Sequence, residues 1–475
     1  MMKRKLTALL LLCCAATLGA KVKLASLVGD NMIVQQQTEV RLWGTAAPKA
    51  EVKVTPSWSG QTVTCRADGQ GRWLVKVQTP EASFTPYEIT FDDGEPLTVG
   101  NVLVGEVWLA SGQSNMEMPL KGFGGCCIKD GQQEIINAAK LPHVRMFNVP
   151  RRQEYEPQTE CGGQWLVPSI ETAPEFSATA WFFATSLSKA LNIPVGIVNS
   201  SYGGSTVESW MCRDLLETYP DISLKPEDMD KLVAWERPLL MYNAMIKPIE
   251  NYTIKGIIWY QGCSNVGRHE TYAQRLADMV NLWRSEWGLG EIPFYYAEVA
   301  PYDYDSPVQD GKAAYLREAQ FKAQSLIPNS AMTSTNDLVE PYERHNIHPR
   351  NKQAVGQRLS YLALNLTYGK KQFICFGPQY KSWTAKGREA WVSFDHLEMG
   401  ICRNYDLQGF EVAGEDRVFH PADKVWLHWQ TNEMVISSDK VEKPVAVRYC
   451  FRDFQPGTMI GGGELPTVPF RTDNW

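Results

Sequence analysis

The stretch GEVWLASGQSNMEMP, residues 105–119, places Ser114 between a glutamine and an asparagine at the end of an apolar run. The run itself is typical of a strand, and Gly112 permits a sharp turn directly after it. A serine at such a junction is either an ordinary turn residue or a nucleophile held at the mouth of a sheet. The rest of the chain has to distinguish the two.

Strands and helices alternate from about residue 104 to residue 368. Strands are predicted at GEVWLAS, IPVGIVNSS, IKGIIWYQG, IPFYYAEVA and NSAMTSTND, and helices at SATAWFFATSLSKAL, TYAQRLADMVNLWRSEWG, AAYLREAQFKAQSL and PRNKQAVGQRLSYLALNLTYG. This alternation predicts an α/β domain built from βαβ units around a parallel sheet. Ligands of such sheets bind at the carboxyl ends of the strands. The polar tips GQSN, NSSYGG, YQGCSN and TSTND should therefore share one edge.

Two β-rich regions flank this domain. Residues 21–103 contain short alternating runs separated by turns such as DGQG and DDGE, which predicts a small sandwich-like domain. Residues 369–475 are again β-rich and form either a second sandwich or the completion of the first. A chain of 475 residues is long enough for two or three domains.

The first twenty residues have a basic start, an apolar middle and small residues at the end. This pattern predicts a signal peptide at residues 1–20 and a periplasmic or secreted protein. The apolar run is too short to span a bilayer, so no stable membrane insertion is expected. Leu12 disfavours a lipid anchor at Cys13 or Cys14. The net charge of −6 and the lack of a Lys/Arg cluster argue against nucleic-acid binding. Nine further cysteines leave disulfide pairing open, and the oligomeric state is open too.

A serine becomes a nucleophile when a base takes its proton and donors stabilise the oxyanion. The candidate base is His348, in NIHPRNKQAVGQRL just before a helix. Candidate donors are two glycines after a strand and two amides in WYQGCSN, namely Gly203, Gly204, Gln261 and Asn265. Met116 stands where the G-x-S-x-G elbow of an α/β-hydrolase has its second glycine, so that fold is not indicated.

Several blocks in order resemble the sialate O-acetylesterase family of the SGNH-hydrolase superfamily. They are GEVWLASGQSNMEMP, IVNSSYGGSTVESWM, IKGIIWYQGCSN, PFYYAEVAPY, LREAQ, NIHPRNKQAVGQRL and LPTVPFRTDNW. The resemblance implies a three-layer αβα hydrolase domain, flavodoxin-like, at residues 104–368, with β-rich accessory structure. It also implies removal of O-acetyl groups from sugars, sialic acids in particular, with no metal and no organic cofactor.

The resemblance carries over residue by residue. Ser114 matches the nucleophile and His348 the base, while Gly204 or its neighbour Gly203 matches the glycine of the oxyanion hole. Gln261, alone or with Asn265, matches the amide-bearing block.

Two positions depart from the family pattern. His345 stands where SGNH hydrolases commonly have an Asp, three residues before the histidine base. The group that orients His348 is then Asp337, Glu340, Glu343 or a backbone carbonyl. Cys263 replaces the Glu of the WYQGE block and is also a rival nucleophile.

Three functions follow from these residues. The first is a serine esterase that deacetylates sialic acids through an acetyl-enzyme. The second keeps the chemistry and acts on another O-acetylated glycan, such as acetylated xylan. The third is a catalytically impaired glycan-binding protein, which the departures at His345 and Cys263 motivate. All three take an O-acetylated sugar or sialoside as the partner.

Overall fold

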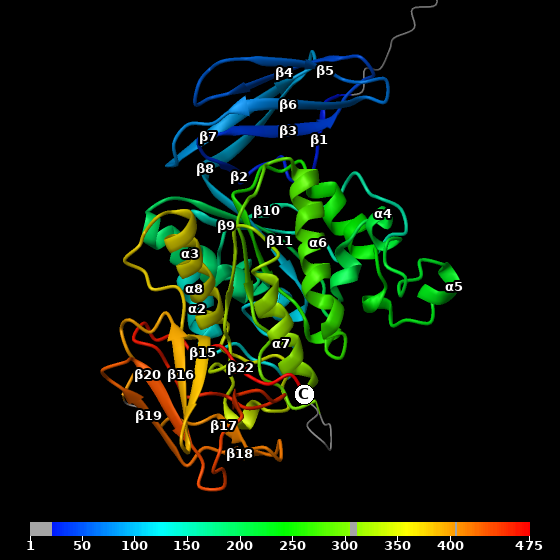
Figure 1. Ribbon diagram of the computed structural model, residues 1–475. Coiled ribbons are helices and arrows are strands. Elements are labelled where there is room, and N and C mark those ends of the chain that lie inside the picture. The colour runs from blue at the N-terminus through cyan, green and yellow to red at the C-terminus, as the bar shows by residue number, and fades with distance from the viewer. Residues whose placement is uncertain (1–20, 305–310, 404–405) are drawn as a thin grey trace, which may run out of the picture.

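The computed structural model describes residues 21–304, 311–403 and 406–475, so the predicted signal peptide at residues 1–20 lies outside the described residues. Three units follow one another along the molecule, with the α/β domain between two β domains (Figure 1). No helix in the described part of the chain is long and apolar enough to cross a membrane.

The first unit is a β-sandwich of two sheets. One sheet has the order β1-β3-β6. Its strands are β1 (Lys23–Leu24), β3 (Glu39–Thr45) and β6 (Arg72–Gln78). The other pairs β2 (Ile33–Gln35), β4 (Glu51–Pro56), β5 (Val63–Arg66) and β7 (Ser83–Asp92) with the start of β8 (Pro96–Gly112). In β6 buried and exposed residues alternate, as a strand with one face on a core requires.

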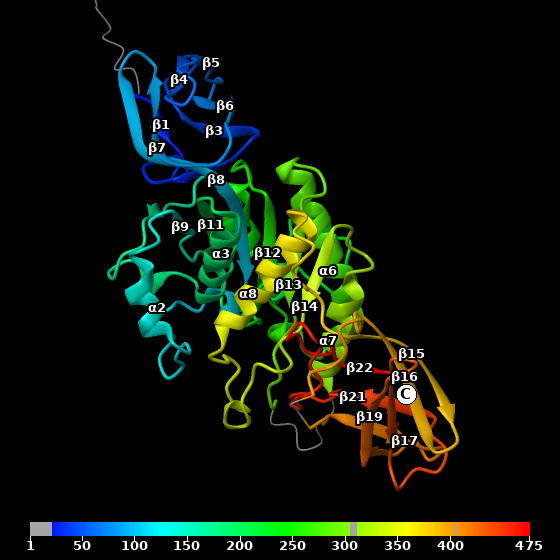
Figure 2. The ribbon, with the colours of Figure 1, turned by 90° about the vertical axis from the view of Figure 1, so that its left-hand side faces the viewer.

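Strand β8 joins this sandwich to the central domain. Its first part pairs with β7 and β2, and its second part pairs in parallel with β11 and β12 (Figure 2). The predicted boundary between residues 103 and 104 therefore falls inside one continuous strand of 17 residues. From Val102 to Gly112 every residue of β8 is buried, because the core of the sandwich encloses its first part and helices cover both faces of the sheet around its second part.

The central sheet has the order β10-β9-β11-β8-β12-β13-β14, parallel except for the edge strand β10. Its other strands are β9 (Val144–Asn148), β10 (Trp165–Leu166), β11 (Val195–Ser201), β12 (Gly256–Tyr260), β13 (Phe294–Ala297) and β14 (Ser330–Thr333). The residues of β9 were not among the predicted strands. The predicted parallel sheet is confirmed, with β8 near its middle.

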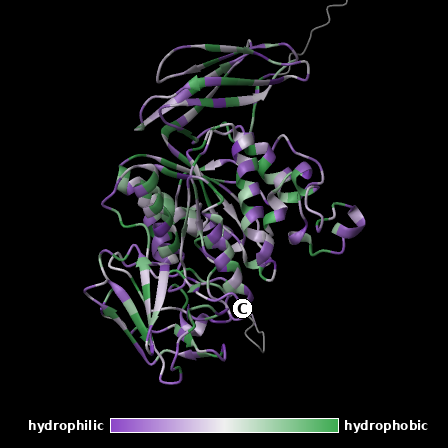
Figure 3. Cartoon of the chain, in the orientation of Figure 1, coloured by the Kyte–Doolittle hydropathy of each residue, from purple (hydrophilic) through white to green (hydrophobic). Residues whose placement is uncertain are grey.

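Helices cover both faces of this sheet. Helices α3 (Ala178–Leu191) and α8 (Lys352–Leu362) pack together on one face, and α6 (His269–Trp287) and α7 (Lys312–Ala323) on the other (Figure 1). The flanking helices alternate hydrophobic and hydrophilic residues along their length (Figure 3), as one buried face requires. The three-layer αβα architecture is thus confirmed. The short helices are α1 (Ser114–Glu117), α2 (Gly131–Ala138), α4 (Arg213–Leu216) and α5 (Pro226–Met229).

Single turns complete the domain. The 3₁₀ turns are η1 (Ala173–Glu175), η2 (Val207–Trp210), η3 (Ala234–Glu236), η5 (Lys247–Ile249), η6 (Cys263–Asn265) and η7 (Pro341–Glu343). Two π-helical turns are η4 (Tyr242–Ile246) and η8 (Ala363–Thr367), the latter extending α8. Much of the tryptophan fills the core: Trp210, Trp259 and Trp283 are fully buried and meet edge to face, with centroids 5.7–6.4 Å apart.

The C-terminal unit is a second sandwich and does not complete the first. One sheet has the order β15-β16-β20-β19 and the other β18-β17-β21-β22. Their bounds are β15 (Gln379–Lys386), β16 (Glu389–Asp395), β17 (Phe410–Ala413), β18 (Phe419–Pro421), β19 (Lys424–His428), β20 (Glu433–Ser437), β21 (Ala446–Tyr449) and β22 (Phe470–Arg471). Buried Arg317 of α7 ties this unit to the central domain by donating to the carbonyls of Cys450, Arg452 and Asp453.

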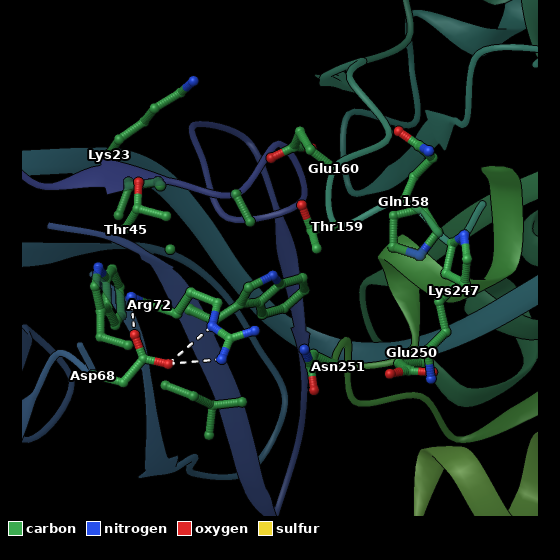
Figure 4. Close-up of a pocket in the computed structure, with 18 residues that line it drawn as sticks. Lys23, Thr45, Asp68, Arg72, Gln158, Thr159, Glu160, Lys247, Glu250 and Asn251 are labelled. Carbon is green, nitrogen blue, oxygen red and sulfur yellow. Dashed lines mark hydrogen bonds and ion pairs between the residues drawn. The ribbon is translucent and has the colours of Figure 1, made fainter. Parts of the chain in front are cut away.

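A cavity of about 640 Å³ lies where the N-terminal sandwich meets the central domain. Figure 4 shows Asp68 and Arg72, joined by an ion pair, on the sandwich side, and Lys247 and Glu250 across from them. Neither Ser114 nor His348 lines this cavity. The strand ends with their polar tips lie elsewhere, at the opposite end of the sheet from the N-terminal sandwich.

Gly112 is the glycine on which the turn after β8 depends. Its φ is 138°, and a Cβ at this position would overlap the carbonyl oxygen of Tyr260 on the neighbouring strand. Gly112→Ala is therefore expected to lower the free energy of unfolding by about 1–3 kcal/mol, measured by urea denaturation. Gly94→Ala is the matched control, because Gly94 has φ 119° with nothing near its Cβ position. Equal destabilisation by the two substitutions would contradict this role for Gly112.

Candidate active site

Ser114 begins α1 at the end of the central strand β8. Gln113, which precedes it, donates its backbone N–H to the carbonyl of Tyr260 at 3.0 Å, and its side-chain oxygen accepts from the N–H of Gly262 at 2.8 Å. Tyr260 is the last residue of β12, and Gly262 follows it in the next loop. The residue that precedes the serine is thus fixed to the end of the adjacent strand, and this fixes the position of the serine.

His348 lies in the loop before α8 and reaches the serine across 234 residues of sequence. Its Nε2 is 2.8 Å from Ser114 Oγ, a hydrogen-bonding distance. The ring of Phe123 meets the imidazole edge to face, with centroids 5.4 Å apart. Both polar side chains are half-buried, so the pair stands at an accessible edge of the sheet.

A buried network joins the two loops. Asn115, the residue after the serine, donates Nδ2–H to the carbonyl of Ile347 at 3.0 Å. Lys352, at the start of α8, donates from Nζ to Asn115 Oδ1 at 2.7 Å and to the carbonyl of Pro349 at 2.5 Å. Asn115 and Lys352 are almost completely buried. The distance between Ser114 and His348 is therefore set by side chains on either side of the pair.

The carboxylates proposed to orient His348 bind other groups. Asp337 forms a two-pronged ion pair with Arg358, both contacts at 2.7 Å. Glu343 accepts the backbone N–H groups of Arg350 and Glu340, each at 3.1 Å, and Glu340 closes the capping box of η7.

Within the described residues, Nδ1 of His348 faces the thiol sulfur of Cys126 at 4.0 Å, a long and weak contact. The position of His348 is fixed instead through a hydrogen bond to its backbone N–H group. Asn346 Oδ1 accepts the N–H of His348 at 3.0 Å and the thiol of Cys126 at 3.5 Å.

Three of the four predicted oxyanion donors are used inside the protein. Gly203 donates its N–H to Glu117 Oε2 at 2.5 Å. Gln261 donates both amide hydrogens, to the carbonyl of Ser205 at 3.0 Å and to Asn265 Oδ1 at 2.8 Å. Asn265 donates to Glu208 at 3.0 Å. Gln261 and Asn265 are fully buried, and their amides join the segment after β12 to the segment after β11.

Two backbone N–H groups, unlike the donors above, have no acceptor among the described residues of the protein. Within the part of the chain that the structure describes, the N–H groups of Ser114 and Gly204 donate to no protein acceptor. Gly204 has φ 80°, a conformation in which glycine is favoured. These two N–H groups are therefore available to donate to a bound ligand.

Burial and charge keep the imidazole neutral. Burial, reinforced by the positive charge of Lys352, lowers the pKa of His348 to about 4. Burial also lowers the pKa of Lys352 to about 7. A neutral imidazole can accept a proton from the serine, so the pair is ready for base catalysis across the ordinary pH range.

Cys263, the rival nucleophile, lies in an environment that disfavours its reactive form. Burial raises the pKa of the Cys263 thiol to about 11, which disfavours the thiolate that a cysteine nucleophile needs. All nine cysteines from Cys65 to Cys450 are free. No cluster of three His, Cys, Asp or Glu residues in the described ranges could hold a metal ion.

A three-layer αβα sheet with a serine–histidine pair at the carboxyl ends of its strands is the architecture of an SGNH-type hydrolase. Residues 104–365 match the family described as carbohydrate esterase, sialic acid-specific acetylesterase, and the chain belongs to this family. It is therefore a carbohydrate esterase, and its fold and family are those expected from the sequence.

Relatives of known name or structure agree with this assignment. Sialate O-acetylesterase of Pongo abelii is 28% identical over 95% of this chain and 92% of its own length. The Homo sapiens enzyme of the same name is 28% identical over 83% of this chain and 80% of its own. The crystal structure of a carbohydrate acetylesterase from Xanthomonas citri superposes with a TM-score of 0.84, at 32% identity over 96% of this chain and all of that one.

Sequence reasoning missed Asn115, Glu117, Cys126 and Lys352. Each has its partner far away in the sequence, so no local pattern identified it. Asn115 belongs to the GQSN motif and Lys352 to the IHPRNK segment, but the two residues that form the contact are 237 positions apart in the sequence.

Lys352 gives a testable pH dependence. Its positive charge disfavours the imidazolium, so Lys352→Met is expected to raise the pKa of His348. The base must be neutral to act, and the acid limb of the kcat/KM profile should therefore move from about pH 4 to higher pH.

The measurement is kcat/KM for a simple acetate ester from pH 3 to pH 9. Lys129→Met is the control, because Lys129 lies in the same region with an exposed side chain. An acid limb that stays in place in Lys352→Met would refute this electrostatic role.

Proposed function

We propose that this carbohydrate esterase removes O-acetyl groups from sialic acids through an acetyl-enzyme on Ser114. The observation that carries the proposal is the 2.8 Å contact between Ser114 Oγ and His348 Nε2, at the strand ends of a carbohydrate-esterase fold. The named relatives, matched over most of their length, support the choice of sugar.

The first half of the reaction transfers the acetyl group to the enzyme. Ser114 Oγ attacks the acetyl carbonyl carbon while His348 Nε2 takes the hydroxyl proton. The N–H groups of Ser114 and Gly204 stabilise the negative oxygen of the tetrahedral intermediate. The bond to the sugar oxygen then breaks, and that oxygen takes the proton from Nε2.

The second half returns the enzyme to its starting state. Water attacks the carbonyl carbon of the acetyl-serine and gives its proton to His348 Nε2. The bond between that carbon and Ser114 Oγ breaks, Oγ takes the proton back from Nε2, and acetic acid leaves and ionises to acetate. The imidazolium that forms twice has no carboxylate on Nδ1 among the described residues, which makes it less stable than in a Ser-His-Asp triad.

A positively charged side chain beside the site supports the proposal of an anionic sugar as the substrate. Arg151 Nη1 is 3.2 Å from Glu117 Oε1, and its guanidinium lies over the ring of Tyr202 at 4.2 Å. Arg151 remains half-exposed. A guanidinium binds a carboxylate through paired hydrogen bonds, and sialic acids carry a carboxylate. Burial raises the pKa of Glu117, which pairs with Arg151 at the edge of the site.

Ser114→Ala is expected to lower acetate release from 9-O-acetyl-N-acetylneuraminic acid by about 10⁴-fold or more. Ser111→Ala is the matched control, three residues away on β8, because the buried Ser111 hydroxyl has no hydrogen-bond partner in the described structure. The control should keep wild-type turnover. Full activity in Ser114→Ala would refute the mechanism.

A substrate panel separates the candidate sugars. The wild-type enzyme is expected to have a higher kcat/KM for the O-acetylated sialic acid than for acetylated xylan, because of the nearby arginine. The reverse order would favour a neutral glycan. Binding of either sugar without turnover of any acetate ester would favour the glycan-binding alternative.

A further inference from the structure

Trp235 differs from the other tryptophans of the central domain, which are buried. Trp108, Trp181, Trp210, Trp259, Trp283 and Trp287 are fully buried, whereas Trp235 in η3 is 47% exposed. Its neighbours Leu232 and Val233 are also exposed. Three exposed apolar side chains within four positions form an apolar surface of the kind that contacts a ligand.

The glycine turn after β11 connects this ring with the nucleophile. A Cβ on Gly203 would lie 3.3 Å from Ser114 Cβ, and a Cβ on Gly204 would overlap Cδ1, Cγ and Nε1 of Trp235. One glycine therefore contacts the serine and the next contacts the indole. The ring stands directly beside the backbone donor that the mechanism assigns to the oxyanion.

The segment that carries Trp235 is anchored at its return to the domain. Leu239 has φ 76°, a strained conformation for leucine, and donates its N–H to the carbonyl of Glu208 at 3.1 Å. The Glu208 side chain in turn binds Asn265 and Arg275. Glu208, which binds the loop after β12 through Asn265, thus also fixes the segment that carries Trp235.

We propose that Trp235 is a substrate-binding residue, on whose indole the pyranose ring of the acetylated sugar stacks. The proposal rests on the proposed function, because it needs the acetyl carbon at Ser114 Oγ. A sugar attached to that acetyl group extends across the Gly203–Gly204 turn toward the ring. The C–H groups of a pyranose face pack well on an aromatic face, and the indole N–H, which has no partner in the described structure, can donate to a sugar hydroxyl.

The test compares two substrates that share the acetyl group. One is 9-O-acetyl-N-acetylneuraminic acid, and the other is ethyl acetate, which has no ring to stack. Trp235→Ala is expected to raise KM for the sugar about tenfold, with a loss of kcat/KM about tenfold larger than that for ethyl acetate. Trp235→Phe keeps an aromatic face and should recover most of the loss.

Trp426→Ala is the matched control, because Trp426 is similarly exposed, at 43%, on β19 of the C-terminal sandwich. It should leave both substrates unaffected. Equal losses on the two esters in Trp235→Ala would show that the ring only supports the loop, and an unchanged KM for the sugar would show that it makes no contact. Either result overturns the proposal while Ser114→Ala still tests the proposed function separately.

Discussion

The bond from Lys352 Nζ to Asn115 Oδ1 is the constraint on which the site depends. Ser114 is positioned by β8 and His348 by the loop before α8, and these segments approach each other only at their tips. Asn115 binds the loop through Ile347, and Lys352 binds both Asn115 and Pro349. These bonds join the tip of β8 to the loop before α8, beside the hydroxyl and the imidazole.

The same lysine has an electrostatic effect that a neutral residue would lack. A buried ammonium close to His348 disfavours the imidazolium, and no carboxylate on Nδ1 offsets it within the described residues. The histidine is therefore a base that is always ready to accept a proton but forms its charged state at a cost. The N–H groups of Ser114 and Gly204 then carry more of the stabilisation of the transition state.

The parts of this arrangement that follow local rules could be predicted from the sequence. The apolar run of β8 and the glycine after it predicted Ser114 at the end of a strand, and the IHP segment predicted His348 just before a helix. In the structure their side chains lie 2.8 Å apart. The hydrogen-bond partners could not be predicted in the same way. Gly203 donates to Glu117, Gln261 to Ser205 and Asn265, and Asp337 pairs with Arg358, although their positions suggested catalytic roles. Which polar group a side chain meets is a property of tertiary packing, and one sequence contains no signal for it.

In the proposed reaction the acetyl group passes through Ser114 Oγ. Rapid quenching of the enzyme with excess O-acetylated sialic acid, followed by peptide mapping by mass spectrometry, tests it directly. We expect one added acetyl group on the peptide that contains Ser114, formed as fast as the sugar is released. An acetyl group on a different residue, or steady turnover without any acetylated peptide, would contradict it.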